Sequence, residues 1–130
     1  MHTIINSVTD RENNLEIITT NIIKQLGIPA NLKGYRYLRY ALMLCAENSE
    51  MITSATKLLY PAIAAKFNTT PLCISSAISR AIGLVWTEEN EELLCLYFGK
   101  SILKRQRKPT NVEFIANISD MLRLRIKKQS

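Results

Sequence analysis

Apolar residues recur at spacings of three and four along most of the chain, which is the pattern of amphipathic α-helices. Gly and Pro number only four each, too few for the frequent turns of an all-β sandwich. The pattern therefore predicts an all-α fold, a compact bundle of about six to seven helices. The stripes place these helices at residues 15–26, 34–47, 51–59, 61–67, 71–86, 87–98 and 111–127.

Residues with special capping preferences mark several helix ends. Gly27 is suited to close the first helix as a C-terminal cap. Thr70 is a natural N-cap for the longest central helix. Thr110 and Glu113 have the spacing of a capping box, in which each residue bonds the backbone N–H of the other, so the last helix is expected to begin there.

Three segments lack the helical pattern. Residues 1–14 show little periodicity and are expected to form a flexible N-terminal arm, so that residues 15–130 make up the folded domain. Tyr60 precedes Pro61 and is expected to break the helix there, because the residue before a proline is disfavoured in the α region. Residues 100–108 are interpreted as a connector ahead of the last helix.

The middle of the chain has the spacing of a helix-turn-helix. A short helix at 61–67 is followed by a turn at 68–70 and by the longer helix at 71–86. In a helix-turn-helix, the second helix lies in the DNA major groove and presents its outward face to base edges. Plain packing of two helices produces the same pattern, so both interpretations stay open at this point.

Basic residues gather near the C-terminus. The chain carries a net charge of +6, and residues 100–130 alone hold nine basic and two acidic groups. Concentrated positive charge is typical of proteins that bind polyanions, although a solvated basic tail has the same composition. The connector contributes Lys100, Lys104, Arg105, Arg107 and Lys108.

Other residue types argue against several function classes. His2 is the only histidine, so the sequence offers no histidine-based nucleophile or metal site, and we expect neither an enzyme nor a cofactor. The three cysteines lack C-x-x-C spacing, which favours a reducing cytoplasm over a disulfide framework. No run approaches the ~18 apolar residues that cross a bilayer, so no membrane partner is expected.

Cys73 is interpreted as a small packing residue, with a redox-sensitive thiol as the alternative.

Ordered strings of residues recur between residues 15 and 128, among them Leu26-Gly27-Ile28-Pro29-Ala30, Lys66-Phe67-Asn68-Thr69-Thr70, Lys108-Pro109-Thr110-Asn111, Glu113-Phe114-Ile115-Ala116 and Leu122-Arg123-Leu124. Taken together, the strings resemble the C-terminal effector domain of the master sporulation-initiation response regulator of endospore-forming Firmicutes. The resemblance implies an all-α helix-turn-helix domain that binds a short promoter element, often as two tandem copies, and activates or represses transcription.

The chain departs from the family on the outward side of the second helix. There the family typically carries Arg, Glu, Arg, Arg and His, and the aligned residues here are Cys73, Ser75, Ser76, Ser79 and Arg80. A bidentate arginine contact to guanine is worth roughly 1–3 kcal/mol of discrimination, whereas serine distinguishes bases poorly. The resemblance thus implies an altered recognition helix. The family's receiver domain is also expected to be missing, because residues 1–14 are too few to form one.

Two functions are consistent with the sequence. The first is a transcriptional regulator in the cytoplasm that binds double-stranded DNA, with a homodimer on tandem sites allowed by the resemblance. The second is a degenerate paralogue, non-specific or without DNA binding, that modulates the homologous regulator or RNA polymerase by protein contact. For the first, the residues expected to contact DNA are Thr69, Thr70, Cys73, Ser75, Ser76, Ser79, Arg80, Lys104, Arg105, Arg107 and Lys108.

Overall fold

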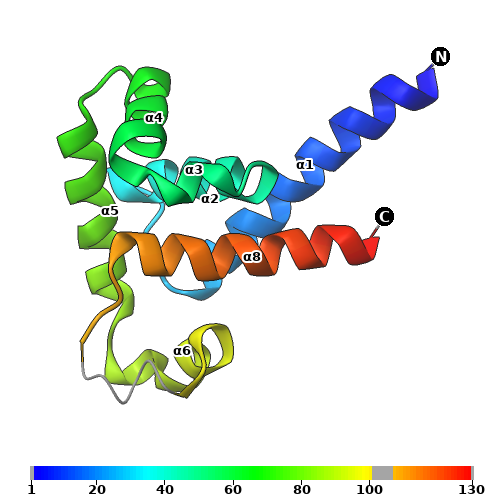
Figure 1. The fold of residues 1–130 in the computed structure, drawn as a ribbon. Coiled ribbons are helices and arrows are strands. Elements are labelled where there is room, and N and C mark those ends of the chain that lie inside the picture. The colour runs from blue at the N-terminus through cyan, green and yellow to red at the C-terminus, as the bar shows by residue number, and fades with distance from the viewer. Residues whose placement is uncertain (1, 101–106, 130) are drawn as a thin grey trace.

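The computed structural model of the chain describes residues 2–100 and 107–129, and within them every regular element is helical (Figure 1). The predicted all-α fold is confirmed. The α-helices are α1 (His2–Gln25), α2 (Lys33–Glu47), α3 (Glu50–Thr53), α4 (Tyr60–Phe67), α5 (Pro71–Val85), α6 (Glu91–Phe98) and α8 (Asn111–Gln129), with a π-helix η1 (Ala55–Leu59) and a 3-10 turn η2 (Glu88–Asn90) between them.

Helix α2 lies at the centre of the bundle. It packs against α1, α5 and α8, and these contacts join one continuous hydrophobic core. Leu38, Ala41 and Leu42 on α2 are completely removed from solvent. The opposing stripe of α8 is equally buried, with Phe114 and Ile118 fully covered. The predicted apolar stripes of both helices are therefore the faces that form the core.

The contact between α2 and α5 is a direct approach of two helix backbones. A Cβ atom added at Gly34 would lie 2.5 Å from the carbonyl oxygen of Ala77 and 3.0 Å from the Cβ of Ala81. Only a residue without a side chain fits at this point of the crossing. Ile74 and Ile78 of α5 are then buried beside α2, which leaves the opposite side of α5 facing outward.

The predicted hairpin of α4 and α5 is present. Helix α4 packs on α5, and Ile63 is fully buried between the elements of the core. Asn68 takes a left-handed conformation, with φ 55° and ψ 53°, which reverses the chain after α4. The Thr70 hydroxyl accepts a hydrogen bond of 3.2 Å from the backbone N–H of Cys73, so Thr70 is the N-cap that the sequence predicted.

The predicted capping box opens α8. The backbone N–H of Glu113 donates to the Thr110 hydroxyl at 3.1 Å, and the N–H of Thr110 donates to the Glu113 carboxylate at 3.0 Å. Arg107 adds an ion pair with the same carboxylate at 3.0 Å. The capping box therefore fixes the segment before α8, and with it the residues that approach α5.

The predicted break at Tyr60 is wrong. Tyr60 has helical angles, φ −61° and ψ −42°, and η1 leads directly into α4. The N–H of Tyr60 bonds to the carbonyl of Ala55, five residues back, as in a π-helix. The wider π turn accommodates Pro61, which has no N–H of its own to continue an α-helical ladder.

The N-terminal segment is helical although its sequence lacks a helical pattern of apolar residues, and its role as a flexible arm stays a prediction. Helix α1 begins at His2, and Figure 1 shows its first turns projecting from the bundle. Residues 2–14 contain neither Gly nor Pro, so helical hydrogen bonding can extend through them from the packed part of α1. Among the side chains that the structure describes, burial in α1 begins at Leu15. The assignment of residues 15–130 as the domain stays a prediction.

The Gly34 contact predicts opposite effects for two glycine substitutions. Gly34→Ala should lower the free energy of unfolding by about 1–3 kcal/mol, because the new methyl group forces α2 and α5 apart. Gly83→Ala, on the exposed side of α5, should raise it by about 0.5–1 kcal/mol through helix propensity. Urea denaturation measures both changes, and equal effects of the two substitutions would contradict the close approach at Gly34.

The capping box predicts an acid-sensitive contribution to stability. Hydrogen bonds from Arg107 and from Thr110 lower the pKa of Glu113 from 4.5 to about 2. Because the pKa is depressed in the folded state, this stabilisation is present above pH 4.5 and is lost as the pH falls toward 2. In urea denaturation, the Glu113→Gln variant should have a lower free energy of unfolding than the parent at neutral pH. The difference between the two free energies should shrink as the pH falls from 4.5 toward 2. A gap that does not change with pH would show that the carboxylate contributes nothing by its charge.

Candidate nucleic-acid interface

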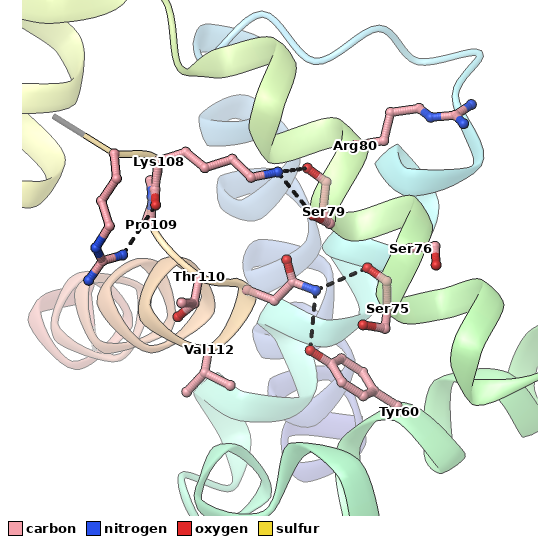
Figure 2. Close-up of a pocket in the computed structure, with 11 residues that line it drawn as sticks. Tyr60, Ser75, Ser76, Ser79, Arg80, Lys108, Pro109, Thr110 and Val112 are labelled. Carbon is pink, nitrogen blue, oxygen red and sulfur yellow. Dashed lines mark hydrogen bonds between the residues drawn. The ribbon is translucent and has the colours of Figure 1, made fainter.

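The outward face of α5 is open to solvent. Cys73, Ser76 and Arg80 are all exposed and follow one another at spacings of three and four, so they form one stripe along the helix. No hydrogen bond or ion pair links Arg80 to any residue that the structure describes. Figure 2 shows the Arg80 side chain extending away from the helix. The central part of the predicted contact face is therefore accessible.

Ser75 and Ser79 lie at the edge of this face and are half-buried. Lys108 of the segment before α8 and Asn111, the first residue of α8, lie along this edge. The Asn111 amide donates to the carbonyl oxygen of Ser75 at 3.0 Å and to the Tyr60 hydroxyl at 3.3 Å (Figure 2). These two serines are thus less available than Ser76, although all three were predicted to lie on the outward side of the helix.

Lys108 lies along the same edge of α5. Its ammonium donates to the carbonyl oxygen of Ser79 at 3.2 Å and to the Ser79 hydroxyl at 3.0 Å (Figure 2). Both acceptors are neutral, so the contacts fix the position of the ammonium and leave its charge uncompensated. Arg107 differs, because its guanidinium is paired with the carboxylate of Glu113 at 3.0 Å.

Two hollows flank the outward face, and Ser76 and Arg80 line both of them. One lies between α5 and the segment before α8 and includes Arg107 and Lys108. The other lies toward the start of α2 and includes Lys33. No Asp or Glu is among the described residues that line either hollow. The surface on both sides of the stripe is therefore positively charged.

Cys73 is exposed, so its interpretation as a packing residue is wrong. The side chain lies at the first turn of α5, before the helix enters the core. Hydrogen bonds with Thr70 and Thr69 lower the pKa of the Cys73 thiol, and the charge of Lys33 acts in the same direction. Cys45 shows the opposite environment, because burial raises the pKa of its thiol to about 11. A redox-sensitive role for Cys73 stays a prediction.

The remaining predicted contact residues fall into two groups. Thr69 is half-buried and Thr70 is exposed at the start of α5. Lys104 and Arg105 lie outside the described residues.

In the basic end of α8, Arg123 is engaged internally: its guanidinium donates to the carbonyl oxygen of Cys45 at 2.6 Å and to Asp120 at 3.2 Å. Arg123 thus ties α8 to α2.

Two residues that the fold brings to this face, Lys33 and Asn111, were not predicted to lie there. Lys33 lies in the hollow beside Cys73 and Arg80, although it precedes them by about forty residues in the sequence. Asn111 was predicted only as the first residue of the last helix, and the structure shows that it is also bonded to α5. The only sequence signal near Lys33 is Gly34, whose missing side chain brings α5 close to the start of α2.

The described part of the chain has neither a cluster of metal-ligating side chains nor a membrane-spanning helix. No group of three or more His, Cys, Asp or Glu residues there is arranged to hold a metal ion. None of the helices described is both long and apolar enough to cross a membrane.

A comparison with known protein families gives a match over most of the chain. Residues 19–122 match the family model described as sporulation initiation factor Spo0A C terminal. The matched region begins within α1, ends within α8, and contains the whole α4–α5 hairpin and the segment before α8. It covers well over half of the chain and confirms the resemblance carried by the sequence strings. The chain therefore belongs to the family of the C-terminal domain of the sporulation initiation factor Spo0A.

Proposed function

We propose that this chain binds duplex DNA through the outward face of α5 and acts as a transcriptional regulator in the cytoplasm. Membership of the family implies a DNA-binding sporulation regulator domain, not an enzyme. The observation that carries the proposal is the exposed stripe of Cys73, Ser76 and Arg80, which lies between two hollows. Basic side chains line both hollows, and no acidic side chain is among their described lining residues.

In this proposal, α5 enters the major groove and its neighbours hold the sugar–phosphate backbone. Ser76 and Arg80 face base edges, since both are exposed and line both hollows. Lys33 on one side and Lys108 on the other face the two strands. Thr70 lies at the start of α5, where backbone contacts are expected, and Lys104 and Arg105 of the connector would add phosphate contacts.

Sequence preference then depends mainly on one side chain. Arg80 has a guanidinium that can bond guanine in two places, whereas Ser76 offers a single hydroxyl that suits several bases. The family's three arginines align with Cys73, Ser76 and Ser79, and Ser79 is half-buried with its hydroxyl bonded to Lys108. We therefore expect a preference that is weaker than the family's and different from it.

A second candidate is contact with a protein, either RNA polymerase, a homologous regulator or a second copy of this chain. The observation that favours it is the exposure of large apolar side chains away from α5. Leu96 on α6 is 75% exposed and Leu124 on α8 is 57% exposed. Failure to bind DNA at low salt, with the fold intact, would favour this candidate.

DNA binding should depend strongly on salt. If three to five cations contact phosphates, the logarithm of the association constant should fall with the logarithm of salt concentration at a slope of about −3 to −5. Fluorescence anisotropy with a labelled mixed-sequence duplex, titrated between ~50 and ~200 mM salt, measures this slope. Lys33→Ala should reduce its magnitude by about 1.

Arg125→Ala is the matched control for Lys33→Ala. Arg125 is exposed, like Lys33, but lies near the end of α8 that points away from α5 (Figure 1). Its removal changes net charge by the same amount and should leave the slope unaltered. Equal effects of the two substitutions would show that binding follows net charge and not this face.

Arg80 should control preference more than total affinity. Against a duplex selected from genomic fragments, Arg80→Ala should lose roughly 1–3 kcal/mol of discrimination relative to a mixed-sequence duplex. Arg80→Lys keeps the charge and removes the two-point bond, so it should retain most affinity for the mixed duplex and still lose the preference. Competition titrations measure both quantities. A uniform loss on every duplex would show that Arg80 contacts phosphate and not a base.

A further inference from the structure

Two small residues, Ser79 and Gly83, form a shallow notch along the edge of α5 that faces the segment before α8. Ser79 and Gly83 are one helical turn apart, and Lys108 lies across them. A Cβ atom at Gly83 would be 3.7 Å from the Lys108 ammonium nitrogen, so the missing side chain leaves this nitrogen uncovered. The notch therefore receives a lysine that comes from a distant part of the sequence.

The charge of Lys108 has no counterpart in the notch. An ammonium group has three donors, and two of them reach the carbonyl and hydroxyl oxygens of Ser79. Neither oxygen carries a formal charge. One donor remains for another acceptor, and Lys108 is exposed. The two bonds thus hold the ammonium in place without neutralising it.

The rest of this hollow favours an anion. Its lining adds the hydroxyls of Ser76 and Thr110, together with Arg80 and Arg107, and includes no carboxylate among the described residues. Arg107 is paired with Glu113, so Lys108 and Arg80 are the lining cations without a described acidic partner. Figure 2 shows the Lys108 ammonium against α5 with its chain stretched toward the helix.

We propose that the hollow between α5 and residues 107–112 is a site for one backbone phosphate of DNA, with Lys108 as its fixed cation. Lys108 then serves as a side chain of the recognition surface, although it does not belong to α5. It provides a positive charge at an edge where α5 itself has only serine and glycine. The inference rests on the proposed DNA binding and adds the position of one contact.

The contact should be indifferent to base sequence, since phosphates are the same in every duplex. Its loss should reduce the magnitude of the salt slope by about 1 and lower affinity at ~0.1 M salt by roughly fivefold to tenfold. A lysine that only held the connector against α5 would affect stability and leave the slope unchanged. The salt slope therefore separates the two roles.

Gly83 provides a test that leaves Lys108 in place. Gly83→Glu puts a carboxylate beside the ammonium and should neutralise it, whereas Gly83→Gln adds a side chain of nearly the same size without charge. We expect Gly83→Glu and Lys108→Ala to reduce the slope by about 1 each, and Gly83→Gln to leave it unchanged. Circular dichroism verifies the fold of each variant before the titrations.

A variant with both Lys108→Ala and Gly83→Glu shows whether the new carboxylate acts through Lys108 or repels DNA directly. If the new carboxylate acts through Lys108, then Lys108→Ala with Gly83→Glu should have the same slope as Lys108→Ala alone. Additive losses would show general repulsion of DNA and overturn the inference, as would equal effects of Glu and Gln at position 83. If Lys108→Ala and Gly83→Glu both keep the parental slope, the phosphate site is wrong while DNA binding stands. Absence of binding by the parent chain would instead defeat the proposed function itself.

Discussion

The bundle depends on the place where α2 and α5 touch backbone to backbone. The absent side chain of Gly34 lets the carbonyl of Ala77 come within a distance that no Cβ tolerates. The isoleucines of α5 then pack beside α2 in the core. With one side of α5 fixed in this way, the other side has to face solvent. The exposed stripe of Ser76 and Arg80 is thus a consequence of how tightly the opposite face is packed.

The chemistry of the interface comes from three segments that are far apart in the sequence. The start of α2 contributes Lys33, α5 contributes Arg80, and the segment before α8 contributes Lys108. The capping box positions the last of these, since it fixes where α8 begins and how the preceding residues meet α5. Local hydrogen bonds at the start of α8 therefore help to shape the surface beside α5.

Much of the fold could be predicted from the sequence, because the signals for it are local. The apolar stripe of α5, the N-cap at Thr70 and the capping box at Thr110 each depend on residues within a few positions of one another. The predicted break at Tyr60 failed, and residues 2–14 are helical without a helical pattern, because helical hydrogen bonding continues along the chain through both places. The π turn carried the chain through Tyr60, and α1 extended to His2 without an apolar stripe.

The candidate site was predicted less completely, because it depends on distances through space. Periodicity identified the outward side of α5, but it could not show that Ser79 would be bonded to Lys108 or that Asn111 would cover Ser75. Likewise, no pattern along the chain placed Lys33 beside Arg80. The central claim is that duplex DNA lies against the outward face of α5. Nuclear magnetic resonance of the isotope-labelled chain, titrated with a short duplex, tests this most directly. The largest chemical-shift changes should occur at Ser76, Arg80 and their neighbours across both hollows, and changes confined to α1 or α6, with α5 unaffected, would contradict it.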